Sequence, residues 1–173
     1  AKKIYSDRQT AKMNEAVREE VRTRGYWFID IPRTSSTSLK KQLGGVMDKS
    51  YTRENLQGVQ SRVQDHMTYQ GIRQFLGPQI TDQIYIFSLI RNPWDRLFSI
   101  YNYRLKNREI ESITFESFVH QLESPRFMIK NSFFNSRHFL LPQVDYLCDA
   151  NGCTDHVMIG KFEERDEFLK IIA

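Results

Sequence analysis

The stretch from Tyr26 to Leu43 constrains the fold of this chain more than any other. A short apolar run, rich in aromatic and β-branched residues, reaches Pro32, and apolar residues resume with helical spacing at Leu39 and Leu43 after a run of small hydroxyl residues. This pattern predicts a strand, a tight loop and a helix. Because proline has no N–H to donate to a strand ladder, we expect the strand to end at Pro32.

The loop in this stretch concentrates groups that bind anions. A strand-to-helix loop turns several backbone N–H groups and a helix N-terminus toward one point, which suits a phosphate or sulfate group. Ser35 or Ser36 can cap the helix. Arg33 would add a positive charge, and Thr37 and Ser38 would add two hydroxyl groups. The alternative is an ordinary turn with a serine cap, and the GxxxxGK[ST] spacing of a nucleotide-triphosphate loop is absent.

A second strand followed by a helix is expected farther along the chain. The strand would span residues 83–90 and end at Arg91, the helix would start at Pro93, and Ser99 would lie about two helical turns beyond the strand. A protein that hydrolyses ATP or GTP tends to place a metal-coordinating aspartate at such a strand end. An arginine there binds an anion directly and repels Mg²⁺, so the pattern favours a donor that is bound without a metal.

Three further segments have the apolar spacing of helices. We expect helices over residues 7–24, 65–76 and 114–122, and the last of these would bury Phe115 and Phe118 in the core. The helix over 65–76 would place His66 in its first turn. A lone histidine at a helix start is more often a surface or capping residue than a catalyst, so the pattern alone gives His66 no role.

The C-terminal segment contains a strong turn signal at Asn151-Gly152. We therefore expect a hairpin or paired strands over residues 142–163, leading into a final helix. Cys148 and Cys153 flank this turn and could face each other across it. The spacing is compatible with two free thiols or with a disulfide, and no metal site is expected because matching ligands are not nearby.

Composition limits the classes of function. The 173 residues fit one domain with its own core, and 40% hydrophobic residues favour a globular chain. A net charge of +4 favours an anionic ligand, but the basic residues are scattered, so nucleic-acid binding is only a weak alternative and no nucleic-acid partner is expected. No apolar run approaches a membrane span and no signal-peptide core is found. We expect a cytoplasmic protein, or a Golgi-lumenal or secreted one if a leader or anchor was removed.

The two anion-binding segments together resemble those of sulfotransferases that use 3′-phosphoadenosine 5′-phosphosulfate (PAPS). The closest resemblance is to the branch of the heparan sulfate 2-O-sulfotransferases and bacterial carbohydrate sulfotransferase-like proteins. The 5′-phosphosulfate loop of that branch reads Pro-Lys-Thr, two small residues, then two hydroxyl residues; residues 32–38 read Pro-Arg-Thr-Ser-Ser-Thr-Ser. The 3′-phosphate motif is matched by residues 91–96, Arg-Asn-Pro-Trp-Asp-Arg, followed by Ser99 and Tyr101. A third similarity, Gln-x-x-aromatic-Leu followed by Gly-x-Phe-Glu, lies within residues 143–163.

This resemblance, over residues 26–168, implies an α/β fold with a central parallel sheet flanked by helices, related to the P-loop nucleotide kinases. The alternation of strands and helices supports the same class independently. We expect a single sulfotransferase domain over residues 1–173, and leave open a truncation at its C-terminus. The implied reaction moves the sulfuryl group of PAPS to a hydroxyl acceptor, a carbohydrate, without a metal. The oligomeric state stays open.

The resemblance also implies which residues form the site. His66 would be the general base, and Arg33 would stabilise charge on the departing phosphate; because arginine stays protonated, it supplies charge and forked hydrogen bonds but no proton. The residues expected to bind the cofactor are Arg33, Thr34, Ser35, Ser36, Thr37, Ser38, Arg91 and Ser99. Two alternatives stay open: a protein that binds PAPS or its 3′,5′-bisphosphate product without turnover, and a kinase-like phosphotransferase.

Overall fold

The structure is a computed structural model. It describes residues 2–34, 39, 66–108, 110, 113–122 and 139–172, with the backbone alone for residues 2–10 and 13. In chain order the described elements are α1 (Lys2–Arg24), β1 (Tyr26–Ile29), α3 (Tyr69–Leu76), α4 (Pro78–Thr81), β2 (Tyr85–Ile90), α5 (Pro93–Lys106), α6 (Phe115–Leu122), α8 (Gln143–Leu147), β3 (Met158–Lys161), the 3₁₀ turn η3 (Phe162–Glu164) and α9 (Arg165–Ile172).

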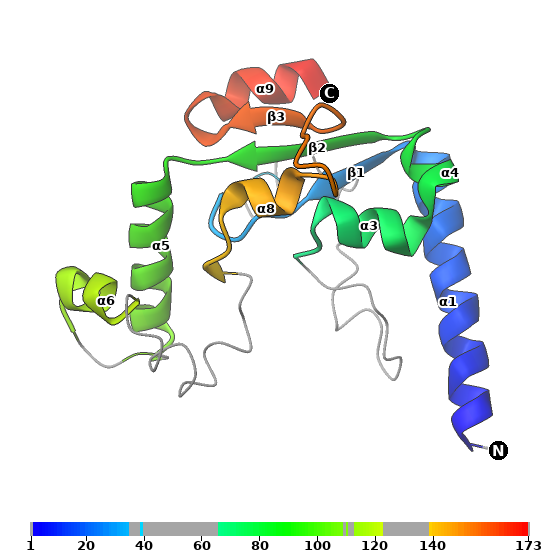
Figure 1. The fold of residues 1–173 in the computed structure, drawn as a ribbon, viewed down its shortest axis with the longest axis horizontal. Helices are drawn as coiled ribbons and strands as arrows, with labels where there is room; N and C mark the ends of the chain where they lie inside the picture. Colours follow the sequence, from blue (N-terminus) through cyan, green and yellow to red (C-terminus); the bar gives the residue numbers. More distant parts are fainter. Residues whose placement is uncertain are drawn as a thin grey trace.

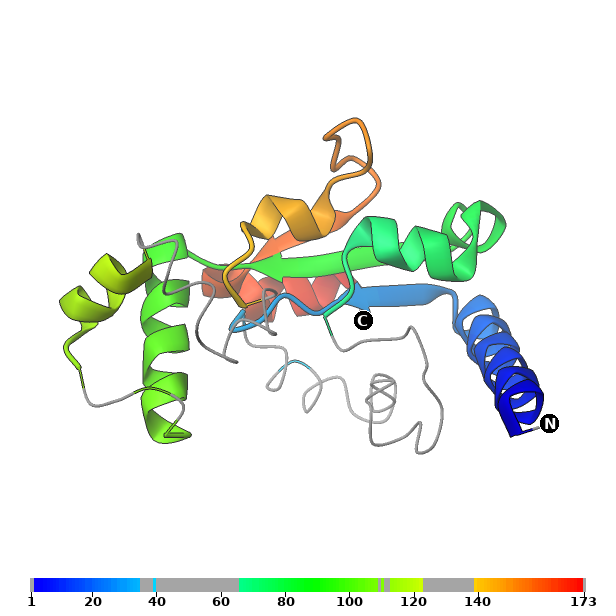
Figure 2. The same cartoon turned by 60° about the horizontal axis from the view of Figure 1, so that its bottom comes forward.

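The described strands form one parallel sheet in the order β1-β2-β3. Ile29 of β1 lies opposite Ser88 of β2, and Ile90 of β2 lies opposite Lys161 of β3. Helix α9 covers one face of this sheet, whereas α3 and α8 lie on the other (Figures 1 and 2). This arrangement confirms the predicted α/β class with a central parallel sheet flanked by helices.

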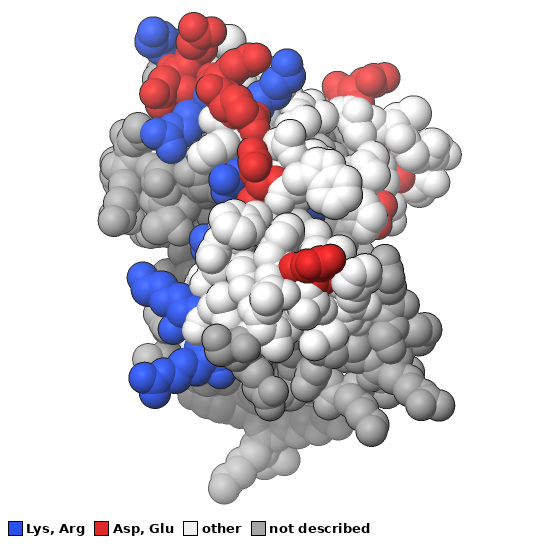
Figure 3. Space-filling view, turned by 90° about the vertical axis from the view of Figure 1, so that its left-hand side faces the viewer, with Lys and Arg blue, Asp and Glu red and all other residues white. Residues whose placement is uncertain are grey.

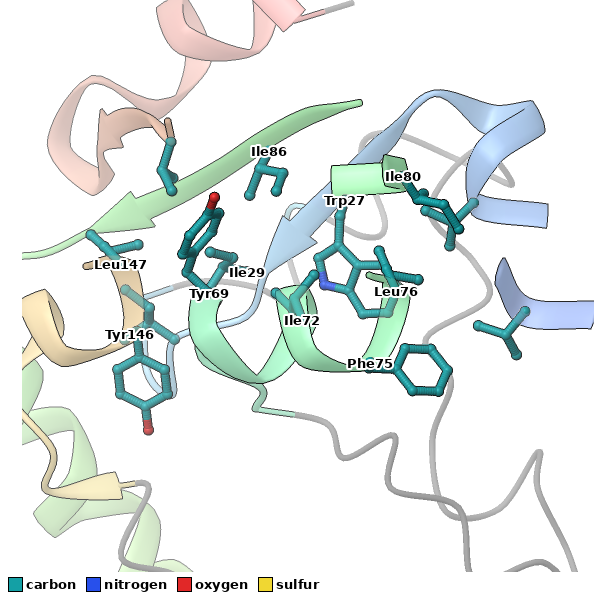
Figure 4. Close-up of a cluster of buried hydrophobic side chains, with 14 residues drawn as sticks. Trp27, Ile29, Tyr69, Ile72, Phe75, Leu76, Ile80, Ile86, Tyr146 and Leu147 are labelled. Atoms are coloured by element: carbon teal, nitrogen blue, oxygen red, sulfur yellow. The ribbon is translucent and has the colours of Figure 1, made fainter. Parts of the chain in front are cut away.

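Alternation along β1 divides its side chains between two cores. Trp27 and Ile29 join the larger core with residues of α3 and α8, as Figure 4 shows. Phe28 instead joins a cluster with Phe87 of β2 and Phe168 of α9. Successive side chains of a strand point to opposite faces, so the two clusters hold helices on both sides of the sheet.

A third cluster joins α5 to α6. Phe118 is fully buried there and Phe115 is partly buried, which confirms that both belong to the core. Helix α5 begins as predicted, with Pro93 in its first turn and the Asn92 side chain accepting from the N–H groups of Trp94 and Asp95. The predicted helices over 7–24 and 114–122 are also confirmed, although the first starts at Lys2.

Two boundaries near the first loop differ from expectation. Strand β1 ends at Ile29, three residues before Pro32, because the N–H groups of Ile31 and Thr34 bond within the turn rather than to a strand. Helix α3 starts at Tyr69, not at residue 65, because the Thr68 side chain caps it by accepting from Gly71 N–H at 3.1 Å. His66 therefore lies in the turn before the helix and not in its first turn.

The predicted C-terminal hairpin is wrong. Its first half is the helix α8, whose Tyr146 and Leu147 are buried in the larger core, and its second half is β3, which pairs in parallel with β2. The Asn151-Gly152 turn is present: Gly152 has φ +82°, and the Asp149 carboxylate accepts from the N–H groups of Asn151 and Cys153. Both cysteines, Cys148 and Cys153, are free thiols.

Within the described part of the chain, no helix is both long enough and apolar enough to cross a membrane.

Candidate functional site

The loops that follow β1 and β2 meet at one edge of the sheet, because parallel strands end on the same side. Arg33 lies four residues after the end of β1, whereas Arg91 directly follows β2 and Ser99 lies on α5. Nε of Arg33 donates to Oγ of Ser99 at 3.0 Å, and Nη1 of Arg91 donates to the carbonyl of Arg33 at 3.4 Å. The structure therefore brings the two predicted anion-binding segments into direct contact.

Arg33 has an unusual backbone conformation. Its φ of +68° lies in the left-handed region, which costs a non-glycine residue about 1 kcal/mol. Its guanidinium stacks over the ring of Tyr103, 4.8 Å from the centroid. Burial lowers the pKa of Arg33, Tyr103 raises it, and the positive charge of Arg91 lowers it again. The loop thus holds this cation in a strained and partly desolvated position.

Arg91 is held by contacts on several sides. Its guanidinium lies 4.5 Å from the centroid of the Phe162 ring, and its backbone N–H and C=O both bond to the side chain of Gln143. Nε of Arg91 is buried and has no hydrogen-bond partner among the described residues. Buried donors are normally satisfied, so this N–H is a candidate donor to an acceptor outside the described residues.

The residue after Arg91 is tied to the C-terminal segment. The N–H of Asn92 donates to the Glu163 carboxylate at 3.1 Å. This hydrogen bond is the main reason why the pKa of Glu163 is lowered. Neither Arg33 nor Arg91 forms an ion pair with a described carboxylate, although the charge of Arg91 contributes to the lowered pKa of Glu163.

Arg96 is a buried arginine that the sequence reasoning missed. Its guanidinium donates to three carbonyls, those of Pro32 at 3.0 Å, Leu141 at 3.0 Å and Phe139 at 2.9 Å. Because C=O and N–H point in opposite directions across a trans peptide, holding the Pro32 carbonyl turns the N–H of Arg33 the other way. The sequence could have indicated that Arg96 is buried. It lies four residues before Ile100, and residues four apart lie on the same face of a helix, here the buried face of α5.

His66 lies at the same edge of the sheet. Its Nδ1 is 2.8 Å from the carbonyl oxygen of Asp30, which directly follows β1. A carbonyl can only accept, so Nδ1 carries the hydrogen and Nε2 of the neutral ring keeps its lone pair. Oδ1 of Asp30 is 3.7 Å from the same nitrogen, and the Phe139 ring packs edge-on at 5.9 Å. The ring is thus fixed in one tautomer beside the first loop.

The other predicted cofactor ligands are placed as follows. Thr34 is fully buried, and its hydroxyl donates to the carbonyl of Ile31 at 2.9 Å, so this hydroxyl hydrogen stabilises the turn. Ser35, Ser36, Thr37 and Ser38 lie outside the described residues. Among the residues that are described, no group of three or more His, Cys, Asp or Glu side chains could hold a metal ion.

Comparison with known proteins identifies the family. The model of the sulfotransferase family matches residues 24–172, a span that includes both loops, His66 and Gln143, and the chain therefore belongs to this family. Its general chemistry is the transfer of a sulfuryl group. No curated protein and no solved structure gives a significant match.

Proposed function

We propose that this protein transfers the sulfuryl group of PAPS to a hydroxyl group of a carbohydrate. The observation that carries the proposal is the contact of Arg33 with Ser99 and of Arg91 with the Arg33 carbonyl, which joins a 5′-phosphosulfate loop to a 3′-phosphate motif. Membership of the sulfotransferase family supports the reaction class. The carbohydrate acceptor rests on the resemblance to the carbohydrate branch of that family.

Arg91 and Ser99 are suited to bind the 3′-phosphate. The Nε–H of Arg91, which has no partner in the described part of the chain, is a charged donor, and such donors make strong bonds to phosphate oxygens. Ser99 Oγ already accepts from Arg33, so its own hydrogen is available to a phosphate oxygen. These two side chains would therefore approach the phosphate from the end of β2 and from α5.

Arg33 and the backbone of its loop are suited to bind the 5′-phosphosulfate. The Arg33 N–H makes no hydrogen bond to a described residue, and the bond from Arg96 to the Pro32 carbonyl fixes its direction. PAPS supplies a sulfuryl group attached to a phosphate leaving group. Arg33 would stabilise the charge that grows on this phosphate, an effect that cationic groups commonly supply in active sites. The predicted contribution of residues 35–38 is part of the same proposal.

His66 is suited to remove the proton of the acceptor hydroxyl. Nδ1–H is held by the Asp30 carbonyl, so Nε2 would accept the proton. The Asp30 carboxylate, with Oδ1 3.7 Å from Nδ1, would stabilise the imidazolium that results. In this role His66 would contact the acceptor hydroxyl and would not contact the nucleotide.

The first test is calorimetric titration with adenosine 3′,5′-bisphosphate and with adenosine 5′-monophosphate, without metal. We expect the wild type to prefer the bisphosphate and Arg91→Ala to lose this preference. Lys106→Ala is the control: it removes one positive charge from the exposed C-terminal end of α5, the helix that carries Ser99, and should keep the preference. Absence of any preference in the wild type would contradict the proposed cofactor site.

Turnover needs a separate assay. A sulfotransferase should release adenosine 3′,5′-bisphosphate from PAPS only when a carbohydrate acceptor is present. Binding without acceptor-dependent release would favour the binding protein, whereas Mg²⁺-dependent consumption of ATP would favour the phosphotransferase.

A further inference from the structure

Gln143 forms a two-point contact with the backbone of Arg91. Its Oε1 accepts from Arg91 N–H at 2.9 Å, and its Nε2 donates to Arg91 C=O at 2.8 Å. Strand β2 ends one residue earlier, at Ile90. The amide of Gln143 therefore continues the backbone hydrogen bonding of β2 by one residue, to Arg91. Arg91 is also the residue proposed to bind the 3′-phosphate.

The helix that carries Gln143 is firmly attached to the fold. Gln143 is the first residue of α8, whose Tyr146 and Leu147 are 0% and 2% exposed and belong to the larger core. The fold thus links this core through α8 and the Gln143 amide to the Arg91 backbone. A displacement of Arg91 would have to break both hydrogen bonds or move a helix that is packed in the core.

The chemistry of the contact suits glutamine. A carboxamide carries an acceptor oxygen and a donor nitrogen on one carbon, which matches the N–H and C=O of a single residue, whereas an ionised glutamate at this position could accept from Arg91 N–H but could not donate to its carbonyl. An asparagine has the same groups on a side chain shorter by one methylene. The two distances of 2.8 and 2.9 Å therefore depend on both the amide and its reach.

A fixed backbone matters for this arginine because its guanidinium is only partly held by other contacts. Nη1 lies 3.4 Å from the Arg33 carbonyl, the Phe162 ring packs 4.5 Å away, and Nε has no described partner. Forked hydrogen bonding to phosphate is directional, so a small shift of the residue weakens the bond sharply. The contact from Gln143 removes that freedom before any ligand binds.

We propose that Gln143 is a positioning residue that sets the selectivity of the site for nucleotides with a 3′-phosphate, acting through the backbone of Arg91. This inference rests on the proposed function, because it assumes that Arg91 binds the 3′-phosphate. It gives α8 a role in nucleotide selectivity, although α8 lies outside the two loops that are proposed to bind the nucleotide. A residue that merely stabilised the fold would not change the preference between two nucleotides.

The test measures that preference in Gln143→Met, which keeps the length of the side chain and removes both hydrogen bonds. Dissociation constants for adenosine 3′,5′-bisphosphate and adenosine 5′-monophosphate are measured by calorimetry on the same preparation. Because a charge-assisted hydrogen bond is worth more than about tenfold in affinity, we expect the ratio of the two constants to fall by about tenfold. The affinity for the monophosphate should stay within about twofold of wild type.

Val144→Ala is the matched control, because Val144 is the next residue of α8 and is exposed. Its ratio should equal that of the wild type. If Gln143→Met does not fold, Gln143→Asn serves instead, since it keeps the amide but cannot span both backbone groups, and its ratio should also fall.

The possible results separate this inference from the proposed function. An unchanged ratio in the Gln143 variants, in a protein whose wild type prefers the bisphosphate and whose Arg91→Ala variant does not, would overturn the role of Gln143 alone. A wild type without any preference would overturn the proposed 3′-phosphate site and the role of Gln143 with it.

Discussion

At the scale of single residues, the conformation of the first loop depends on Arg33, whose φ of +68° is strained for a residue other than glycine. Three groups hold Arg33 in this conformation: Ser99 accepts from its side chain, Tyr103 stacks against its guanidinium, and Arg91 donates to its carbonyl. Strain of this kind persists only where the surroundings determine the conformation, and it is common at functional sites.

Substitution of Arg33 should affect turnover strongly. We expect Arg33→Ala to lower kcat/KM for PAPS by about a hundredfold, because removal of one group that stabilises developing charge typically costs this much. Arg33→Lys keeps the positive charge and should stay within about tenfold of wild type. Steady-state kinetics with a carbohydrate acceptor checks both values. Wild-type activity in Arg33→Ala would contradict the role proposed for this residue.

His66 gives a second prediction for a single residue. Since its proposed role is to accept the acceptor proton, we expect His66→Ala to lower kcat by at least about a hundredfold. The affinity for adenosine 3′,5′-bisphosphate should stay within about twofold, because His66 bonds to Asp30 and is not proposed to contact the nucleotide. His120→Ala, an exposed histidine of α6, is the control and should keep full turnover. A matching loss of nucleotide affinity in His66→Ala would assign the residue to the nucleotide site instead.

At the scale of elements, the contact between β3 and α9 depends on the absence of one side chain. A Cβ added at Gly160 would overlap the ring of Phe168, which is buried in the cluster on this face of the sheet. We expect Gly160→Ala to lower the free energy of unfolding by about 1 to 3 kcal/mol, the usual effect of excess volume in a core. Urea denaturation measures this change. Met158→Ala, at an exposed position of the same strand, should lower the free energy of unfolding much less. Equal losses of stability in the two variants would contradict the packing of Phe168 against Gly160.

The elements that were predictable from the sequence are those with strong local signals. Arg33 and Arg91 each follow an apolar run, and the helix of Ser99 starts at a proline, so β1, β2 and α5 could be inferred. The helix predicted after the first loop, from Leu39 to Leu43, lies outside the described residues apart from Leu39. The contact between the two loops was not predicted, because it depends on how β1 and β2 pair. The C-terminal hairpin was wrong because the Asn151-Gly152 turn fits a hairpin and also a turn between α8 and β3. The choice depends on burial of α8 and on pairing of β3 with β2, and both are long-range contacts.

The two polar residues that support the site were harder to infer. Among the described residues, Arg96 and Gln143 bond to backbone groups alone, in contacts that join residues 43 to 64 positions apart. A backbone carbonyl or N–H is present at nearly every residue, so the sequence does not show which of them a side chain will reach. The resemblance pointed to Gln143 as part of a pattern, but its partner became visible only in the structure.

At the scale of the whole molecule, charge is divided unevenly. The chain has a net charge of +4, yet acidic side chains gather over η3 and α9, at the top of Figure 3, with some basic side chains among them, whereas the side chains lower along one edge are basic. The site itself holds Arg33 and Arg91 close together, and the charge of Arg91 lowers the pKa of Arg33. The Glu163 carboxylate offsets part of the charge of Arg91, but neither arginine forms an ion pair with a described carboxylate. The two cations therefore repel each other, and this repulsion makes the folded state less stable than it would be with an anion bound.

A nucleotide with two phosphate groups should therefore stabilise the whole fold. At a concentration one hundred times its dissociation constant, adenosine 3′,5′-bisphosphate should raise the free energy of unfolding by about 2.7 kcal/mol, because it binds the folded state alone. Urea denaturation with and without the ligand measures the gain, and added salt should reduce it by weakening the ligand's binding. At the same ligand concentration, Arg91→Ala should lose most of the gain and Lys106→Ala should keep it. Equal gains in wild type and Arg91→Ala would show that the ligand binds elsewhere, because the phosphate would then not depend on the arginine at the end of β2.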